Sequence, residues 1–168
     1  MASSASRNVS FARVKTDVAE LAGWVNAKFE ASVYEDPHSP LCIIAANNGD
    51  MDQIHARLED YARTVSELTV VRNDVYARFS HAAYNKGTAL AEITKLTGLE
   101  RNDVFVAGDH LNDLPMLRRK YAQFIASPAN GVPAVLTAVA QNEGYISQFR
   151  QGSGVADALR FFLAKDRP

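Results

Sequence analysis

The feature that most constrains this chain is a short apolar segment that runs directly into an acidic turn. Residues 104–107 read Val-Phe-Val-Ala, a β-branched and aromatic run typical of a buried strand, and Gly108 ends it. The turn that follows carries two carboxylates, Asp109 and Asp113. Ligands of open α/β sheets bind outside the carboxyl ends of the strands. We therefore expect an α/β fold with a ligand site at this turn.

The side chains of this turn suit a hard divalent cation. Asn112 precedes Asp113, and Mg²⁺ prefers oxygen ligands such as carboxylates while it retains several waters. The structural alternative is that Asp109 and Asp113 cap the segment that follows and complement its helix dipole. His110 is interpreted as a partly exposed turn residue rather than a metal ligand.

A lysine and a helix precede the strand. Residues 85–90 read Asn-Lys-Gly-Thr-Ala-Leu, and the helix that they open is expected to end at Gly98. Lys86 falls in the first turn, where a cation is mildly unfavourable, which favours a functional role over a solvated lysine. The apolar positions on one face of this helix are Ala89, Leu90, Ile93 and Leu96.

Together these motifs resemble the signatures of the haloacid dehalogenase-like phosphatases. Residues 108–113, Gly-Asp-His-Leu-Asn-Asp, resemble that family's last motif, and residues 85–90 resemble its lysine motif. The resemblance covers about residues 40–164 and is specific only around these two motifs. It implies the rear part of a Rossmann-like parallel-sheet core, and hydrolysis of a phosphate ester by way of an aspartyl-phosphate.

The resemblance also implies a role for each motif residue. Asp109 would bind Mg²⁺ directly, and Asp113 would be a second ligand or would hold a metal-bound water or Lys86. Asn112 would orient groups through its amide, and Lys86 would neutralise the nucleophile and the phosphoryl oxygens. The order of elements is similar to the family's sugar-phosphatase branch, which implies a small phosphorylated substrate of the sugar-phosphate class.

The family's nucleophile motif, Asp-x-Asp-Gly-Thr on the first strand, has no clear counterpart. One Asp-x-Asp is present, and its functional interpretation makes Asp50 the nucleophile and Asp52 the general acid. The structural interpretation is that either acid caps the following helix. Residues 47–49 separate these acids from the preceding strand, Gln53 replaces the expected glycine, and the acids lie too close to Lys86 for the family order. We therefore expect a chain that lacks the nucleophile and is inactive alone.

The pattern along the chain predicts three parts. Residues 1–10 are rich in Ser and Ala and are expected to form a disordered leader. Residues 11–82 are predicted as α-β-α-β-β, with a loop at 35–40 and a hairpin turn at Asn73-Asp74, and resemble part of the family's α/β cap. Residues 83–168 are predicted as the C-terminal part of the core. The other expected elements are helices over 14–29, 54–65, 86–97 and 114–119, helices opening at 133 and after 154, and strands at 41–46, 68–72, 75–79, 104–107, 123–127 and 145–147.

The predicted strand at 104–107 is expected to be an edge of its sheet. The strands that would bear the nucleophile and the phosphoryl-binding Ser or Thr have no counterpart in this sequence. An unpaired apolar edge favours pairing with another chain. We therefore expect a homo-oligomer or a complementing chain.

Composition narrows the possible partners. The net charge is −1, which lacks the basic excess of nucleic-acid-binding proteins. The single cysteine, Cys42, excludes an intrachain disulfide and has the apolar neighbours of a core thiol. No apolar run approaches the ~18 residues of a membrane span. His38, His55 and His81 are not spaced as a metal pair. We expect a cytoplasmic protein without nucleic-acid or membrane partners.

Two other interpretations stay open. The chain could be a non-catalytic interaction or regulatory module that keeps the metal-binding turn, in which case it needs a partner protein and is insensitive to loss of Lys86. It could also be a truncated product of an ordinary enzyme, in which case an in-frame Asp-x-Asp-Gly-Thr stands upstream of Met1.

Overall fold

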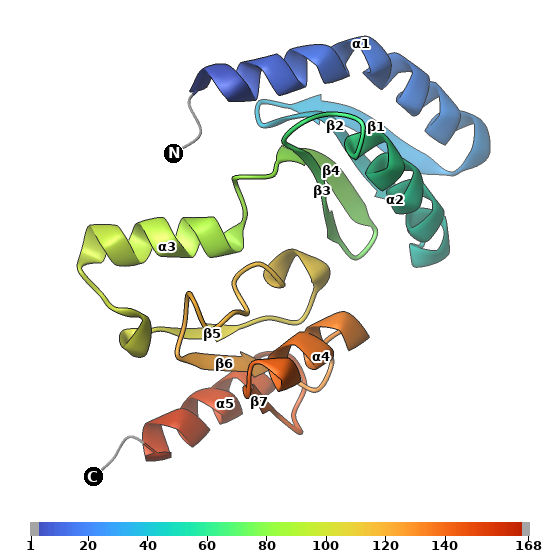
Figure 1. The fold of residues 1–168 in the computed structure, drawn as a ribbon. Coiled ribbons are helices and arrows are strands. Elements are labelled where there is room, and N and C mark those ends of the chain that lie inside the picture. The colour runs from blue at the N-terminus through green and yellow to red at the C-terminus, as the bar shows by residue number, and fades with distance from the viewer. Residues whose placement is uncertain (1–3, 166–168) are drawn as a thin grey trace. The chain divides into compact units, whose positions relative to one another are not determined.

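A computed structural model describes the backbone of residues 4–165 and the side chains of Val14 and residues 17–164. The chain divides into two compact units, residues 1–84 and 85–168, and each is described here by itself (Figure 1).

The first unit is a four-stranded antiparallel sheet with helices packed on it. Its strand order is β1-β2-β4-β3, and every neighbouring pair is antiparallel. The elements are α1 (Ser4–Lys28), β1 (Ala31–Asp36), β2 (Ser39–Ala45), α2 (Asn48–Ala62), β3 (Leu68–Asn73) and β4 (Tyr76–His81).

The core of the first unit lies between one face of this sheet and the two helices. Because side chains alternate across a strand, Ile43 of β2 and Phe79 of β4 point to the same side, and both are fully buried. They belong to one apolar cluster with Val25 of α1 and Ile54 and Leu58 of α2. The helices at 14–29 and 54–65 were predicted from this apolar periodicity, and both are present.

The predicted loop at 35–40 is wrong in extent, and the strand β1 was not predicted. The structure has a hairpin in which β1 pairs with β2, and Pro37 and His38 form its turn. The backbone N–H of His38 donates a hydrogen bond to Asp36 at 2.7 Å and closes that turn. An edge strand with one wet face carries many polar residues, so its sequence resembles a loop.

Two boundaries of the first unit also differ from expectation. Residues 1–10 were expected to form a disordered leader, but α1 begins at Ser4, and residues 1–3 lie outside the described part. No proline interrupts the segment from Ser4 to Val14, so nothing in its sequence prevents the helix from extending. The β3–β4 turn is Asp74-Val75, one position later than predicted, and Asp74 takes the left-handed φ of 53° that aspartate tolerates.

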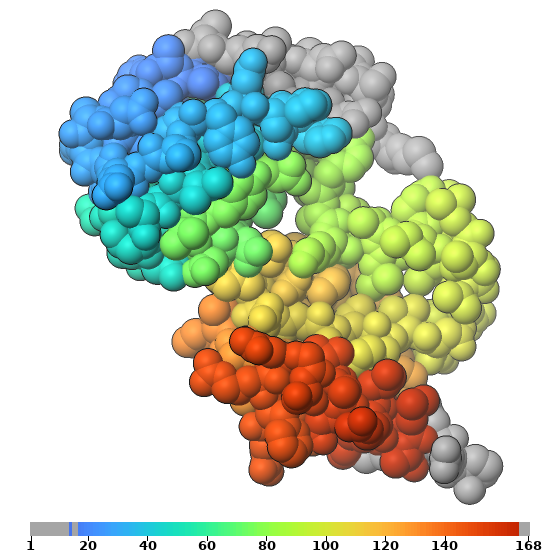
Figure 2. Space-filling model, turned by 180° about the vertical axis from the view of Figure 1, so that it is seen from behind, coloured from blue at the N-terminus to red at the C-terminus, as the bar shows by residue number. Residues whose placement is uncertain are grey.

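The second unit contains a parallel three-stranded sheet in the order β5-β6-β7. Figure 2 shows this unit from α3, in yellow-green, to α5, in red. Its elements are α3 (Lys86–Thr97), the 3₁₀ turn η1 (Arg101–Asp103), β5 (Phe105–Ala107), the 3₁₀ turn η2 (Leu111–Asp113), β6 (Phe124–Ser127), α4 (Pro133–Gln141), β7 (Tyr145–Ile146) and α5 (Gln151–Lys165).

The two faces of this parallel sheet are covered by different side chains. Val106 and Ile125 are register partners, and both join the apolar cluster that contains Leu90 of α3 and Val135 of α4. On the opposite face, Phe105 and Phe124 contact the ring of Phe162 in α5. The predicted α/β fold with a parallel sheet is therefore confirmed, and β5 is an edge of the described sheet, as expected.

Residues 114–121 differ from the predicted short helix. The segment forms successive turns, with hydrogen bonds such as that from the Tyr121 N–H to the Arg118 carbonyl. Arg119 explains the difference, because its guanidinium donates to the carbonyls of Gln123, Asn142 and Glu143. The hydrogen bonds to Asn142 and Glu143 link the segment to a distant part of the chain, and such tertiary contacts override helix propensity.

Candidate functional site

The site begins where β5 ends. The Gly108 N–H continues the ladder by donating to the Ala126 carbonyl at 3.2 Å, and the chain then turns back so that Asp113 lies against Gly108. A Cβ atom at position 108 would stand 2.4 Å from the Asp113 Cβ and 2.9 Å from its Oδ2. Only glycine permits this approach, so Gly108 is the residue that lets the second carboxylate reach the end of the strand.

Asp113 is the buried centre of this turn, with 5% of its surface exposed. Its Oδ2 accepts hydrogen bonds from the backbone N–H groups of Asp109 at 3.0 Å and His110 at 3.2 Å. Its Oδ1 accepts a hydrogen bond from the ammonium group of Lys86. Asp113 thus closes the η2 turn from its third position and also holds Lys86, while the N-cap of the turn is His110 and neither aspartate.

Lys86 reaches Asp113 because α3 begins close to the turn that follows η2. Asn85 caps the helix, and its side chain accepts from the N–H groups of Gly87 and Thr88 at 3.0 Å each. A Cβ atom on Gly87 would meet the Pro115 carbonyl oxygen at 2.4 Å, so this glycine also permits a close approach. The sequence placed Gly87 in the lysine motif but did not predict this close contact, because Pro115 is distant from Gly87 in the sequence.

Asp109 is exposed, and its carboxylate is held from one side. Its Oδ2 accepts a hydrogen bond from Nδ2 of Asn130 at 3.0 Å, and its backbone carbonyl accepts from the Val132 N–H at 2.9 Å. Its second oxygen, Oδ1, accepts no hydrogen bond from the described residues. Within this turn, Oδ1 of Asp109 is therefore the carboxylate oxygen that a ligand can reach.

One cleft of about 440 Å³ joins these side chains, and it lies entirely within the second unit. Lys86, Asp109 and Asp113, which the sequence analysis singled out, all line it, whereas Asn112 is half-buried in η2 and does not. The other lining residues are Ala107, Gly108, Met116, Pro128, Gln151, Gly152 and Val155.

The start of α5 was not predicted as part of the site. The helix begins at Gln151 rather than after Gly154, so Gln151 and Gly152 reach the cleft. The backbone N–H of Gln151 donates to Oδ1 of Asn130 at 2.6 Å. Neither Asn130 nor Gln151 belongs to the two motifs from which the site residues were predicted.

The donor set fits a hard, partly hydrated cation. No group of three or more His, Cys, Asp or Glu side chains that could hold a metal occurs in the part of the chain that the structure describes. A dehydrated, fully protein-ligated ion such as structural Zn²⁺ therefore has no candidate site there. Mg²⁺ is commonly bound through one or two carboxylates, with water and phosphate oxygens completing its shell. The open oxygen of Asp109 matches that second pattern.

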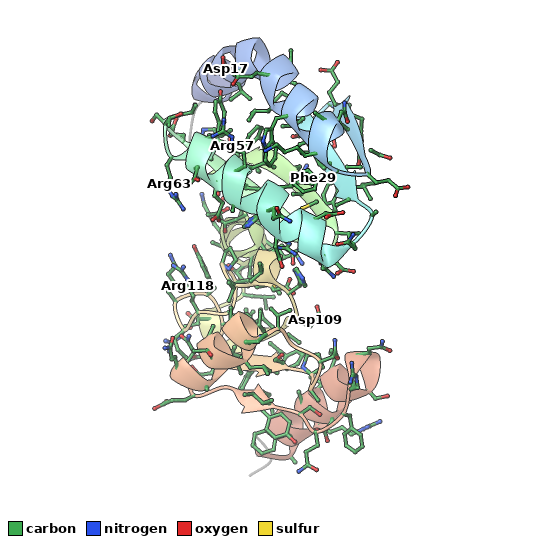
Figure 3. All side chains as sticks on the ribbon, turned by 90° about the vertical axis from the view of Figure 1, so that its right-hand side faces the viewer. Asp17, Phe29, Arg57, Arg63, Asp109 and Arg118 are labelled. Atoms are coloured by element: carbon green, nitrogen blue, oxygen red, sulfur yellow. The ribbon has the colours of Figure 1, made fainter. Side chains whose placement is uncertain are left out.

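In Figure 3 the side chains of Asp109 and Arg118 lie on different sides of the second unit. The neighbouring cations Arg118, Arg119 and Lys120 do not line the cleft.

The Asp-x-Asp of the first unit is engaged in local structure. The N-cap of α2 is Asn47. The structural interpretation, which gave this role to Asp50 or Asp52, is therefore wrong. Asn47 accepts from the Asp50 N–H at 2.9 Å, and its Nδ2 donates to the Asp50 carboxylate at 2.8 Å. Asp52 forms an ion pair with Arg72 of β3.

The remaining reactive side chains of the first unit also have ordinary surroundings. Cys42 is fully buried, and burial raises the pKa of its thiol, which keeps the thiol protonated and unreactive. His55 faces Glu59 one helical turn away at 3.7 Å, and burial lowers the pKa of its imidazole. Neither residue suggests a second catalytic centre in the described first unit.

Comparison with known proteins connects this geometry to a family. The model of the haloacid dehalogenase-like hydrolases matches residues 22–159. A phosphoglycolate phosphatase of Methanococcoides burtonii is 28% identical over 111 residues, which are 64% of this chain and 46% of that protein. The phosphoglycolate phosphatase of Methanothermobacter thermautotrophicus is 27% identical over 112 residues, 67% of this chain and 46% of that protein. The chain thus spans about half the length of these curated relatives.

Solved structures show the same fold. The sucrose-phosphatase of Synechocystis sp. PCC6803, crystallised with sucrose and phosphate, superimposes with a TM-score of 0.60 at 17% identity. The superposition covers 86% of this chain and 62% of that one.

No helix within residues 4–165 has the length and apolar character needed to cross a bilayer.

Proposed function

The chain belongs to the haloacid dehalogenase-like hydrolase family, and on that premise we propose that it forms the cation-binding part of a magnesium-dependent phosphatase. The observation that carries this proposal is the convergence of Lys86, Asp109 and Asp113 on one cleft at the carboxyl end of β5. We assign the second unit to the rear of the catalytic core and residues 11–82 to a partial cap.

Each site residue has a role that its contacts support. Asp109 would be the direct ligand of Mg²⁺ through Oδ1, because its other oxygen already accepts a hydrogen bond from Asn130. Asp113 is the residue that holds Lys86 and the turn, since both of its oxygens already accept hydrogen bonds from protein donors. Asn112 lies in η2 beside Asp113, and its proposed role is to orient groups around the site through its amide.

Lys86 provides the positive charge for a phosphoryl group. Its side chain is 49% exposed while it contacts Asp113, so the ammonium group is available to a second anion. A flexible ammonium is a point charge suited to phosphate oxygens. Bound Mg²⁺ would add charge neutralisation, which is the main demand of phosphoryl transfer on a protein.

The substrate class follows from the family and not from a contact in this chain. We propose a small phosphorylated molecule of the sugar-phosphate class. Two relatives named as phosphoglycolate phosphatases and a fold neighbour named as a sucrose-phosphatase support a small phosphate ester. A cytoplasmic location stays a prediction.

We propose that this chain alone lacks the nucleophile. Asp50 is held by Asn47 in the cap of α2, and Asp52 pairs with Arg72, so both acids serve local structure. The chain matches only 46% of the phosphoglycolate phosphatases' length, and the rest of such a protein is where we place the attacking aspartate.

The decisive experiment separates cation binding from turnover. Manganese, a spectroscopically visible substitute for magnesium, should bind the wild-type protein, and Asp109→Asn should weaken this binding at least ~10-fold, as expected for the loss of a ligand charge. Asp50→Asn is the matched control and should leave Mn²⁺ affinity unchanged. Wild-type protein that fails to bind Mn²⁺ would contradict the proposal.

Hydrolysis of p-nitrophenyl phosphate then tests the missing nucleophile. We expect background rates for the isolated chain with Mg²⁺. Magnesium-dependent turnover that Asp109→Asn abolishes would show instead that the chain contains its own nucleophile, and the Asp50→Asn variant would test that acid.

An association surface supports the second candidate function, that of an interaction module. β5 is an edge strand of the sheet among the described residues, and α3 and the segment that follows it expose apolar side chains. The exposed fractions are 55% for Ile93, 76% for Leu96 and 49% for Leu99. We propose that this surface, the β5 edge with Ile93, Leu96 and Leu99, pairs with a further α/β segment that adds a parallel strand to β5.

A further inference from the structure

Asn130 lies outside both sequence motifs, yet its side chain joins two walls of the cleft. Its Nδ2 donates to Oδ2 of Asp109 at 3.0 Å, and its Oδ1 accepts from the Gln151 N–H at 2.6 Å. Asp109 follows β5, Asn130 follows β6, and Gln151 begins α5. One side chain therefore connects three segments that are far apart in the sequence.

The chemistry of these two partners suits an amide at this position. A carboxylate only accepts hydrogen bonds and a backbone N–H only donates, so the bridging group must offer a donor at one end and an acceptor at the other. This requirement also assigns the orientation of the Asn130 amide, because the flipped amide would place oxygen against carboxylate and NH₂ against N–H.

Backbone contacts hold the loop of Asn130 in the same place. The Val132 N–H donates to the Asp109 carbonyl at 2.9 Å, and the Ala129 N–H donates to the Phe149 carbonyl at 2.8 Å. The loop after β6 is thus attached to the Asp109 turn on one side and to the segment before α5 on the other.

Gln151 adopts a conformation that needs such support. Its φ of 52° lies in the left-handed region, which is uncommon for a residue that carries a side chain. Such conformations persist only where the surrounding structure maintains them. The hydrogen bond from the Gln151 N–H to Asn130 helps to maintain this conformation. Gln151 itself lines the cleft.

We propose that Asn130 is a positioning residue for the cation site. By occupying Oδ2 of Asp109, its amide directs the cation to Oδ1, and by holding the Gln151 N–H it links the orientation of that carboxylate to the first turn of α5. Cation binding at Asp109 therefore further stabilises the start of α5. This inference rests on the proposed function, because it requires that Asp109 binds the cation.

The experiment compares the wild-type protein with Asn130→Ala, using Mn²⁺ affinity and hydrogen exchange of the Gln151 amide. Outer partners of metal ligands typically change affinity by about 10–100-fold when they are removed, and we expect a loss in that range for Asn130→Ala. Mg²⁺ should slow exchange of the Gln151 amide at least ~3-fold in the wild-type protein, and this protection should disappear in the variant.

Two further variants separate positioning from stability. Asn142→Ala is the matched control, because Asn142 also bonds backbone groups of the second unit, those of Arg119 and Ala138, without contacting Asp109. It should keep the Mn²⁺ affinity of the wild-type protein. The double variant Asn130→Ala/Gln151→Gly tests stability separately, because glycine adopts the left-handed φ without strain. Its thermal stability should exceed that of Asn130→Ala, while its Mn²⁺ affinity stays low.

The outcomes distinguish the two proposals. Wild-type protein that binds no Mn²⁺ overturns the proposed function and this inference with it. Wild-type binding together with an unchanged affinity in Asn130→Ala overturns this inference alone. It is also overturned if Asn142→Ala weakens binding as much as Asn130→Ala, or if Gln151→Gly restores affinity along with stability.

Discussion

Lys86 donates a hydrogen bond to the carboxylate of Asp113, a residue 27 positions away in the sequence. The Asp113 side chain is 7% exposed and the Lys86 side chain 49% exposed, so a nearly buried anion holds a cation that faces solvent. The other oxygen of Asp113 accepts the N–H groups of Asp109 and His110. A single carboxylate thus connects the lysine of α3 to the turn after β5.

Replacing Asp113 should therefore damage the site and the fold together. Asp113→Asn removes the charge that holds Lys86 and places an NH₂ donor against either the Lys86 ammonium group or the backbone N–H groups. Because hydrogen bonds to charged groups contribute about 1.5–3 kcal/mol, we expect the free energy of unfolding to fall by about that amount in urea titrations.

Lys86→Gln provides the control for this change. Its half-exposed ammonium is screened by water, so its loss should cost below about 1 kcal/mol. Equal destabilisation by the two substitutions would show that the ion pair, and not the buried acceptor, stabilises the turn.

Gly108→Ala should disable cation binding through a steric effect. The new methyl group would stand 2.4 Å from the Asp113 Cβ, so the acidic turn must move away from β5. We expect a loss of stability of about 1–3 kcal/mol, typical of overpacking, and a loss of Mn²⁺ binding measured by paramagnetic resonance.

Gly98→Ala is the matched control for Gly108→Ala. Gly98 ends α3 at a φ of 69° with no atom within 4 Å of a built Cβ, so alanine there adds backbone strain without a clash. It should lower stability by about 1 kcal/mol and leave Mn²⁺ affinity intact. Intact Mn²⁺ binding in Gly108→Ala would contradict the proposed geometry.

Asp157 should make the second unit sensitive to acid. Ser147 and Tyr145 donate hydrogen bonds to its carboxylate at 2.6 and 2.9 Å and lower its pKa below the ordinary value. A group whose pKa is lowered in the folded state stabilises that state at neutral pH, and this contribution is lost as the pH falls through the folded pKa.

The measurement is the melting temperature from neutral to acidic pH. The wild-type protein should melt above Asp157→Asn at neutral pH, and the difference should shrink towards zero as the pH falls below the ordinary titration range of a carboxyl group. A difference that stays constant over this range would exclude the carboxylate charge as its source. Asp60→Asn, at an exposed position on α2, is the control for a general charge effect.

The association surface makes a prediction about size in solution. Light scattering after size-exclusion chromatography should show self-association of the isolated chain at micromolar concentration, because the β5 edge and the side chains of Ile93, Leu96 and Leu99 are uncovered. Leu96→Glu should reduce this association, since it places a charge in the centre of the apolar face. A wild-type chain that stays monomeric would contradict the prediction.

Several local features of this protein were determined by its sequence. Asn85 and Gly98 bound α3 because the side chain of one caps a helix and the other lacks the Cβ that opposes a left-handed φ. The apolar run at 104–107 became β5, and the glycine after it ended the strand. These outcomes depend on groups a few positions apart, so the order of residues is sufficient to predict them.

Other features were decided only by tertiary structure. Ile93 and Leu96 were predicted on the apolar face of α3, but that face packs only through Leu90, and the other two side chains remain exposed. The link from Asp109 through Asn130 to Gln151 depends on three loops that meet in space. Local periodicity shows which residues are apolar or polar, whereas contacts between distant segments decide which of them are covered and which partners they bind.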